Sequence, residues 1–525
     1  MAATSQPLAT AAAVDVMRRG GTAIDAAIAA NAVLAVVEPM SCGIGGDLFA
    51  IVWDAKTTTL SGFNGSGRAP RACTRDLFIG RAMERIPERG PLSWSVPGCV
   101  DGWFSLHQRY GCIPMSDLLA PAIQAARDGF PVSPVIAQAW DESTDLLCAD
   151  EGAASTFLPG GRAPCTGEVF RNLALADVME QIAVLGRDVF YCGEIARELD
   201  AYACSIGAVL REHDLVEHRS NWIEPVSVDY RGHRVWQLPP NTQGIAVLEM
   251  LQILKGFDLR AAGHNTEAYV HLLVEAKKLA YEDRARFYAD PDAVDLPITH
   301  LLSSEYAARQ RERIQLDQAA TQYPILDQRL LGADTVYLSV VDEAGNAVSL
   351  IQSIFHPFGS GNVPASLGFA LQNRGSLFSL DGSHANSLAP GKRPFHTIIP
   401  GFVTQNERPA FSFGVMGGDM QPQGQVQVLL NLLEFGMDPQ QAGEALRFRH
   451  DGSSTPVGAR MCDGGEVFVE PGFSAGTISG LRQRGHRISV SAGGYGGYQG
   501  IWIDPRTGVR IGGSEPRKDG CAFGY

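Results

Sequence analysis

Two β-rich runs that flank a short turn constrain the fold more than any other feature of this chain. Residues 335–341 and 347–353 are rich in β-branched and aromatic side chains, and the five residues between them include a glycine. This pattern is typical of a β-hairpin. If the hairpin is symmetric about Ala344, Thr335 lies opposite Ser353, with Cβ atoms about 4.5 to 5.5 Å apart. The sequence therefore predicts two neighbouring hydroxyl groups where the first strand begins.

Side-chain alternation assigns the hairpin residues to two faces. Val336, Leu338 and Val340 share one face, and Thr335 points to the other. We expect the apolar set to pack against a core and Thr335 to lie on a polar side. Threonine is also a common strand residue, so periodicity alone gives Thr335 no chemical role.

Composition indicates a globular protein with a small-molecule substrate. Of the 525 residues, 45% are hydrophobic and 19% are charged, which argues against long disordered tails. The formal net charge of −14 disfavours nucleic acid and anionic membrane surfaces as partners. The nearly apolar run from Ala26 to Val37 is shorter than the about 20 residues needed to span a bilayer, and residues 1–7 lack the basic start of a secretory signal. We therefore expect a cytoplasmic protein.

Neither a metal nor a cofactor is indicated by the sequence. Its ten cysteines form no C-x-x-C pair, and no H-E-x-x-H motif is present. The glycine-rich stretch 493–497 fits neither G-x-G-x-x-G nor a Walker pattern, so it is interpreted as a turn.

Helical and strand patterns divide the chain near residue 334. Thr22 and Asp25 form a variant capping box before an Ala-rich helix, and helical periods recur at 118–126, 194–205 and 268–289. After Thr335, short strands with glycine turns dominate. The polar stretch 315–332 is the best linker candidate.

Ordered blocks along nearly the whole chain resemble the γ-glutamyltransferase family of N-terminal-nucleophile (Ntn) hydrolases. The blocks are 7–10, 20–27, 38–46, 95–98, 283–284 with 290–291, 338–348, 358–361, 390–394 and 417–418. The resemblance implies an α+β fold, the four-layer αββα sandwich, built from both fragments of a self-cleaved precursor. A helix-rich large (α) subunit, 1–334, and a strand-rich small (β) subunit, 335–525, would then form one domain.

The resemblance also implies roles for particular residues. Cleavage between Asp334 and Thr335 would make Thr335 the first residue of the small subunit, so that its own α-amino group, with a reference pKa of about 7.7 to 8.0, serves its hydroxyl as base. Ser353 matches the second hydroxyl residue of the family, and Gly417 with Gly418 matches its oxyanion hole. By itself the glycine pair would indicate only a tight turn. The processed protein would be an αβ heterodimer, and two heterodimers could associate.

Several positions depart from the family pattern. Family enzymes hold a γ-glutamyl group with an Arg and an Asp, and this chain has Ser66 and Leu377 at those places; Phe355 replaces another polar contact. The substrate-binding candidates are instead Arg374, His396, Thr397 and Asn373. Arginine suits bidentate recognition of a carboxylate. Arg374 could equally be a solvated surface residue, and His396 a satisfied buried histidine.

Three functions remain open from these observations. The first is a self-processing amidohydrolase for a small carboxylate-bearing amide such as oxamate, because these changes resemble the family branch that includes oxamate amidohydrolase. The second is a γ-glutamyl hydrolase or transferase that uses other contacts. The third is an unprocessed binding protein that keeps the fold without catalysis.

Overall fold

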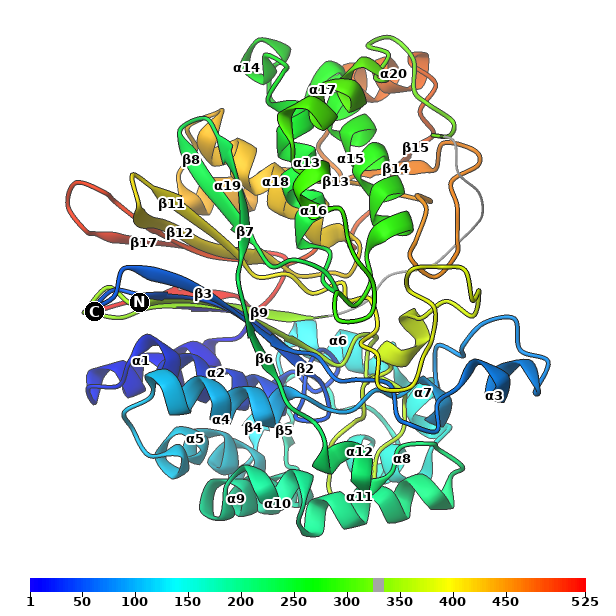
Figure 1. Ribbon diagram of the computed structural model, residues 1–525. Coiled ribbons are helices and arrows are strands. Elements are labelled where there is room, and N and C mark those ends of the chain that lie inside the picture. The colour runs from blue at the N-terminus through cyan, green and yellow to red at the C-terminus, as the bar shows by residue number, and fades with distance from the viewer. Residues whose placement is uncertain (324–334) are drawn as a thin grey trace.

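Two β-sheets face each other at the centre of the molecule, and helices cover their outer faces (Figure 1). The computed structural model describes residues 1–323 and 335–525. The result is the four-layer αββα arrangement expected from the sequence. In the described part of the chain, no helix is both long and apolar enough for a membrane span.

The first sheet combines strands from the two ends and the middle of the chain. Within the described residues it has seven strands, in the spatial order β18 (Cys521–Phe523), β1 (Ala2–Thr4), β9 (Val336–Val341), β10 (Ala347–Ser353), β2 (Asp47–Asp54), β3 (Thr59–Gly65) and β6 (Asn221–Ile223). All neighbouring pairs in it are antiparallel.

The second sheet is also antiparallel. Its six strands in the described chain are β17 (Arg510–Ser514), β16 (Tyr498–Ile503), β12 (Arg408–Val415), β11 (Gly401–Gln405), β8 (His233–Gln237) and β7 (Val226–Tyr230). Two smaller sheets lie outside this pair, formed by β13 (Phe448–Asp451), β14 (Glu466–Val469) and β15 (Ile488–Val490), and by β4 (Phe130–Pro131) and β5 (Val169–Phe170).

Each sheet has its own helical layer. The helices on the side of the first sheet are α1 (Pro7–Arg18), α2 (Ala23–Val37), α4 (Cys99–Tyr110), α5 (Met115–Asp128), α6 (Pro134–Asp141), α7 (Thr144–Cys148), α8 (Glu151–Phe157), α9 (Leu173–Leu185), α10 (Arg187–Tyr191), α11 (Glu194–Ser205) and α12 (Glu212–Val216). The second sheet is covered by α13 (Gly244–Leu254), α14 (Leu259–Ala262), α15 (Glu267–Phe287), α16 (Ile298–Leu301), α17 (Ser304–Glu312), α18 (Met420–Leu433), α19 (Pro439–Glu444) and α20 (Ala475–Gln483). The short helix α3 (Arg75–Ile79) lies to one side.

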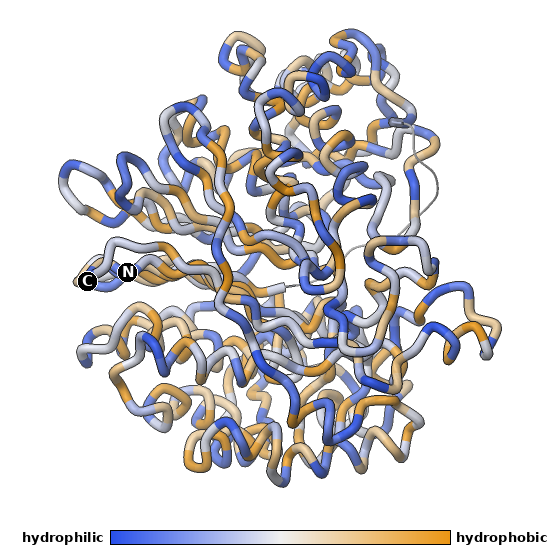
Figure 2. The backbone as a smooth tube through the Cα atoms, viewed as in Figure 1, coloured by the Kyte–Doolittle hydropathy of each residue, from blue (hydrophilic) through white to orange (hydrophobic). Residues whose placement is uncertain are grey.

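Strand alternation explains the four layers. Val336, Leu338 and Val340 belong to the core between the first sheet and its helices, as the sequence predicts. Tyr337 and Val341 belong to a separate core between the two sheets. The second sheet covers the Thr335 face, so Thr335 is buried, but its hydroxyl has the polar neighbours Ser353 and Gln421 there, as expected. Figure 2 shows hydrophobic residues recurring along the strands of both central sheets.

The predicted helix boundaries are largely confirmed. Thr22 and Asp25 form a complete capping box at the start of α2, whose residues are all buried. Helix α11 spans the predicted residues, and α15 begins directly after its N-cap Thr266. Small alanine side chains let α2 lie close to its neighbours on all sides, which suits a helix with no solvent face.

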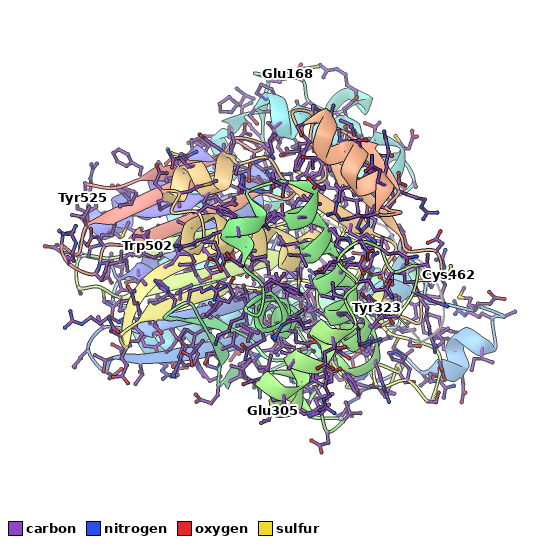
Figure 3. The ribbon with its side chains drawn as sticks, turned by 90° about the horizontal axis from the view of Figure 1, so that it is seen from above. Glu168, Glu305, Tyr323, Cys462, Trp502 and Tyr525 are labelled. Carbon is purple, nitrogen blue, oxygen red and sulfur yellow. The ribbon has the colours of Figure 1, made fainter. Side chains whose placement is uncertain are left out.

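The two ends of the molecule along the strands differ. Trp502 and Tyr525 lie toward one end, and Tyr323, the last residue described before the gap, lies toward the other (Figure 3). The chain re-enters the described structure at Thr335, directly before β9.

Candidate active site

A row of polar side chains crosses the first sheet where β9 begins. The hairpin has the predicted register, with Val341 opposite Ala347 and Tyr337 opposite Ile351. The Thr335 hydroxyl lies next to that of Ser353, with an Oγ1–Oγ distance of 3.4 Å. This confirms the predicted neighbourhood of the two hydroxyl groups.

The same row continues into β2. Ser353 pairs with Asp47, so hydroxyl, hydroxyl and carboxyl side chains follow one another across three adjacent strands. Asp47 was not among the residues expected at the site. The sequence signal for it was its place directly after the glycine turn 43–46, but the pairing with Ser353 is a contact between distant segments.

Thr335 is buried and its hydroxyl has a second neighbour. The Gln421 Nε2 donates to Thr335 Oγ1 at 3.5 Å. Ser353 Oγ accepts the backbone N–H of Phe355 at 2.8 Å. Phe355 has φ of 81°, a left-handed conformation that costs a residue with a side chain about 1–3 kcal/mol. Asp334, the expected residue before the cut, lies outside the described residues.

Gly417 and Gly418 form the turn between β12 and α18. Their φ values are 109° and 54°, a region that glycine enters without steric penalty. Among the described residues, neither N–H group donates a hydrogen bond, whereas the Gly418 carbonyl accepts from Gln243 Nε2 at 2.9 Å. The turn therefore offers two backbone donors that are not used for folding.

A cavity of about 820 Å³ opens beside this turn. Gly418, Thr397 and Phe355 lie in its wall. The remaining wall comes from the segments 83–88, 376–381 and 455–459 and from Arg284, His356, Phe395 and Asp419. Both parts of the chain, before and after residue 334, thus line the cavity.

Arg374 lies behind the cavity wall. It is fully buried, its Nη1 donates to Thr397 Oγ1 at 2.8 Å, and its guanidinium carbon lies 4.5 Å from the centre of the Phe355 ring. Its Nε and Nη2 have no hydrogen-bond partner in the described chain. Burial lowers the pKa of Arg374 to about 9, and Asp47 opposes this shift. The solvated-surface interpretation of Arg374 is wrong, and the guanidinium retains free donors.

His396 and Asp47 complete a buried cluster with Arg374. Asp47 Oδ2 lies 3.7 Å from Arg374 Nε and 3.4 Å from His396 Nε2. Burial raises the pKa of Asp47 to about 7, against the influence of Arg374 and of hydrogen bonds from Gly67 and Gln372. Burial, together with Arg374, holds the pKa of His396 well below its usual range, so the imidazole is neutral. His396 does not reach the cavity wall.

Asn373 supports the cavity wall from behind. Its Nδ2 donates to the Glu88 carbonyl at 2.5 Å and contacts His356 Nδ1 at 2.8 Å, while its Oδ1 accepts the His356 N–H. Glu88 and His356 both line the cavity. Asn373 thus fixes two parts of the wall and contributes no surface of its own.

The positions that differ from the family pattern offer no charge to a substrate. Ser66 donates its hydroxyl to Asn64 Oδ1 at 2.6 Å and accepts from Asn241. Leu377 and Phe355 line the cavity with apolar surface. A γ-glutamyl group would find neither the Arg nor the Asp of the usual pocket at these places.

A second charged pair, Arg284 with Asp419, lies in the cavity wall and was not predicted. Arg284 donates to Asp419 through Nη1 at 2.7 Å and Nη2 at 3.1 Å, and its Nη1 also reaches Gln243 Oε1. Burial disfavours the Asp419 carboxylate, but Arg284 outweighs it and lowers the pKa of Asp419. Arg284 stands in the recognised block 283–284 and Asp419 directly follows the block 417–418, so a signal existed, but their pairing is not local.

One cluster in the described chain has metal-ligand chemistry: His271, Glu275 and His486. The two imidazoles bond each other at 2.8 Å, and Glu275 accepts from Lys278 Nζ at 2.8 Å and from the Tyr323 hydroxyl. An ammonium group this close to the carboxylate disfavours a cation there. None of the three residues contacts Thr335 or lines the cavity, and the cluster is satisfied by protein partners.

Fold and site together define an Ntn hydrolase of the amidohydrolase type. The sequence profile described as gamma-glutamyltranspeptidase matches residues 9–525, and the chain belongs to this family. The glutathione hydrolase-like YwrD proenzyme of Bacillus subtilis is 38% identical over 98% of this chain and 97% of its own length. The oxamate amidohydrolase proenzyme of Klebsiella pneumoniae is 34% identical over 100% and 98%. The crystal structure of cephalosporin acylase from Bacillus halodurans superposes with a TM-score of 0.92, at 43% identity, over 100% of this chain and 96% of that one.

Proposed function

We propose that this chain is a self-processing amidohydrolase that hydrolyses the amide of a small carboxylate-bearing substrate, such as oxamate to oxalate and ammonia. The main support for this proposal is Arg374, a buried cation directly behind the cavity wall. It has free N–H donors and is hydrogen-bonded to the wall residue Thr397. A carboxylate is the ligand that fits such a guanidinium.

In this proposal Thr335 is both the cleavage point and the nucleophile. Its α-amino group, freed by cleavage after Asp334, removes the hydroxyl proton as Oγ1 attacks the amide carbon. The same amine returns the proton to the leaving nitrogen. Water then hydrolyses the acyl ester and regenerates Thr335. Support comes from the 3.4 Å contact with Ser353, which is positioned to steady the hydroxyl.

The oxyanion of the tetrahedral intermediate is assigned to the N–H groups of Gly417 and Gly418. Their free donors and left-handed backbone support this assignment. One such donor is worth about 3 to 4 kcal/mol of transition-state stabilisation.

A γ-glutamyl substrate is the second candidate, and Arg284 with Asp419 favours it. The pair presents a cation and a carboxylate in the cavity wall, the two charges that recognise an α-carboxylate and an α-amino group. A cavity of about 820 Å³ also accommodates glutathione, which is much larger than oxamate. The third candidate is a catalytically inactive binding protein whose chain is not processed.

Measuring how fast the processed protein hydrolyses oxamate and glutathione decides between the first two candidate functions. We expect release of ammonia from oxamate and no release of glutamate from glutathione; the reverse result would overturn the first proposal. Gel electrophoresis under denaturing conditions tests the third. Processing predicts fragments of 334 and 525 − 334 = 191 residues, and Thr335→Ala should give a single band.

A further inference from the structure

Asp47, Arg374 and His396 form a buried cluster whose charges are incompletely matched. All three side chains are fully buried, yet Asp47 Oδ2, Arg374 Nε and Nη2, and both His396 nitrogens have no hydrogen-bond partner among the described residues. Buried polar atoms in proteins are almost always paired. So many unpaired atoms in one cluster indicate a group that changes its partners during function.

The contact between Asp47 and Arg374 is loose. Asp47 holds its Oδ1 in two good hydrogen bonds, from the Gly67 N–H at 3.0 Å and from Gln372 Nε2 at 2.9 Å. Its Oδ2 stays 3.7 Å from Arg374 Nε and makes no hydrogen bond to it. Arg374 makes its one short contact with Thr397, on the side of the cavity. Asp47 therefore acts as a counter-ion that a better-placed carboxylate can replace.

A carboxylate bound to Arg374 would lie close to a second carboxylate, Asp47, in a fully buried site. Two anions that share one guanidinium in a buried site repel strongly, and protonation of one relieves the repulsion. The substrate carboxylate accepts short hydrogen bonds from Arg374, whereas Asp47 Oδ2 has none to lose. Asp47 is thus the group that gains the proton, with the neutral His396 beside it at 3.4 Å.

We propose that carboxylate binding is coupled to proton uptake at Asp47: the bound carboxylate replaces Asp47 as the counter-ion of Arg374, and Asp47 takes one proton from solvent. Asp47 is then a positioning residue, because it acts on the substrate through Arg374. This inference rests on the proposed role of Arg374 as the carboxylate anchor.

The pKa of Asp47 in the absence of a substrate carboxylate agrees with this coupling. Burial raises the pKa of Asp47 to about 7, so near neutral pH a proton is gained at little cost. The other ionisable groups that face the cluster are Arg393, Cys99 and His356, and after cleavage the α-amino group of Thr335 across β10. Above pH 7 the wild-type affinity for a carboxylate should fall about tenfold per pH unit, because one proton must be taken up; below pH 7 it should level off.

Calorimetric binding of oxalate to the processed wild-type protein, from pH 6 to 8.5 in two buffers of different ionisation enthalpy, tests the coupling. We expect uptake approaching one proton above pH 7. Asp47→Asn mimics the protonated carboxyl, so between pH 6 and 7.5, below the pKa of Arg374, it should show no uptake, an affinity independent of pH, and at pH 7.5 a Kd about one quarter of the wild-type value. Because Asp47→Asn keeps the Thr335 amine, the difference between the two proteins isolates Asp47.

Two controls sharpen the result. Glu249→Gln changes another buried carboxyl group, one bonded to Tyr288 and outside the cavity wall, and should retain wild-type proton uptake. Oxamide, which lacks a carboxylate, should show no proton uptake with either protein. If Asp47→Asn does not fold or process, the wild-type titration decides alone, and absence of uptake above pH 7 overturns the coupling.

The outcomes separate this inference from the proposed function. The coupling is overturned if the wild type binds oxalate without proton uptake, or if Asp47→Asn takes up as many protons as the wild type. Either result leaves Arg374 as the carboxylate anchor. If the wild type does not bind oxalate, or if Arg374→Met binds oxalate as tightly as the wild type, both the coupling and the proposed role of Arg374 are overturned. Binding of glutamate in place of oxalate overturns the oxamate-type function, and the same comparison with glutamate then decides the coupling.

Discussion

At the residue scale, Arg374 combines full burial with unused hydrogen-bonding capacity. A guanidinium that leaves water loses several kcal/mol of solvation, and its contacts with Thr397, Phe355 and the distant Asp47 replace only part of this. A substrate carboxylate would supply the missing partner once Thr397 or Phe355, which line the cavity and contact Arg374, moves aside.

Replacement of Arg374 should therefore affect substrate binding strongly. We expect Arg374→Met to lower kcat/KM for oxamate about 10- to 100-fold, mainly through KM, because charged hydrogen bonds contribute about 1.5 to 3 kcal/mol. Steady-state kinetics on processed protein measures this. Arg85→Met is the matched control, since Arg85 lies at the same cavity but is exposed. An equal loss in both variants would contradict a specific role for Arg374.

The backbone of Gly417 should be equally sensitive. Its φ of 109° is strained for alanine, and an added Cβ would lie 3.1 Å from the Gly496 Cα. We expect Gly417→Ala to slow both processing and turnover, about 10²-fold or more for turnover if its N–H group is displaced from the oxyanion. Band intensities over time and initial rates report the two effects. Gly493→Ala, with φ of 84° and open space around its Cα, adds strain elsewhere and should process normally.

At the element scale, the hairpin and the long helices could be predicted because their signals are local. Register follows from alternation and a five-residue turn, and the start of α15 from one capping threonine. The cluster of Asp47, Arg374 and His396 could not be predicted, since Asp47 lies far from the other two residues in sequence. Periodicity also could not show that a second sheet covers the Thr335 face, because either face of an isolated hairpin can be polar or buried.

Helix α15 also anchors the segment that leads toward the expected cleavage site. Glu275 and Lys278 form a fully buried pair, and they bond the N–H and carbonyl of Ala320, the carboxylate also accepting from the Tyr323 hydroxyl. His271 contacts the Gln315 carbonyl at 2.7 Å. This part of the predicted linker is thus fixed to the helical layer.

Breaking the buried pair should destabilise the molecule. In the Thr335→Ala background, which keeps one chain, we expect Lys278→Met to lower the free energy of unfolding by about 3 to 5 kcal/mol, because Glu275 is left buried and unpaired. Urea unfolding gives the value. The double variant Lys278→Met/Glu275→Leu should recover part of the loss. A single variant as stable as its background would argue against the pair as the anchor of residues 315–323.

At the scale of the whole molecule, both sheets join strands from the two sides of residue 334. In the first sheet, β1 pairs with β9 and β18, and β2 pairs with β10; in the second, β8 pairs with β11. The core between the sheets likewise draws on both parts, with Phe49 and Leu238 beside Tyr337 and Phe402. Cleavage before Thr335 would cut one peptide bond and none of these contacts.

The two fragments should therefore stay together after cleavage without a covalent link. Separating them would expose four strand ladders and the apolar core between the sheets, and cysteine cross-links are not needed, since all ten cysteines are free. Size-exclusion chromatography with light scattering should give a single species containing both fragments at native pH, and separate fragments only in denaturant. Elution of a free 191-residue fragment under native conditions would contradict this shared core (525 − 334 = 191). The measured mass also shows whether the species is one heterodimer or a pair of heterodimers, because each heterodimer contains one copy of each fragment.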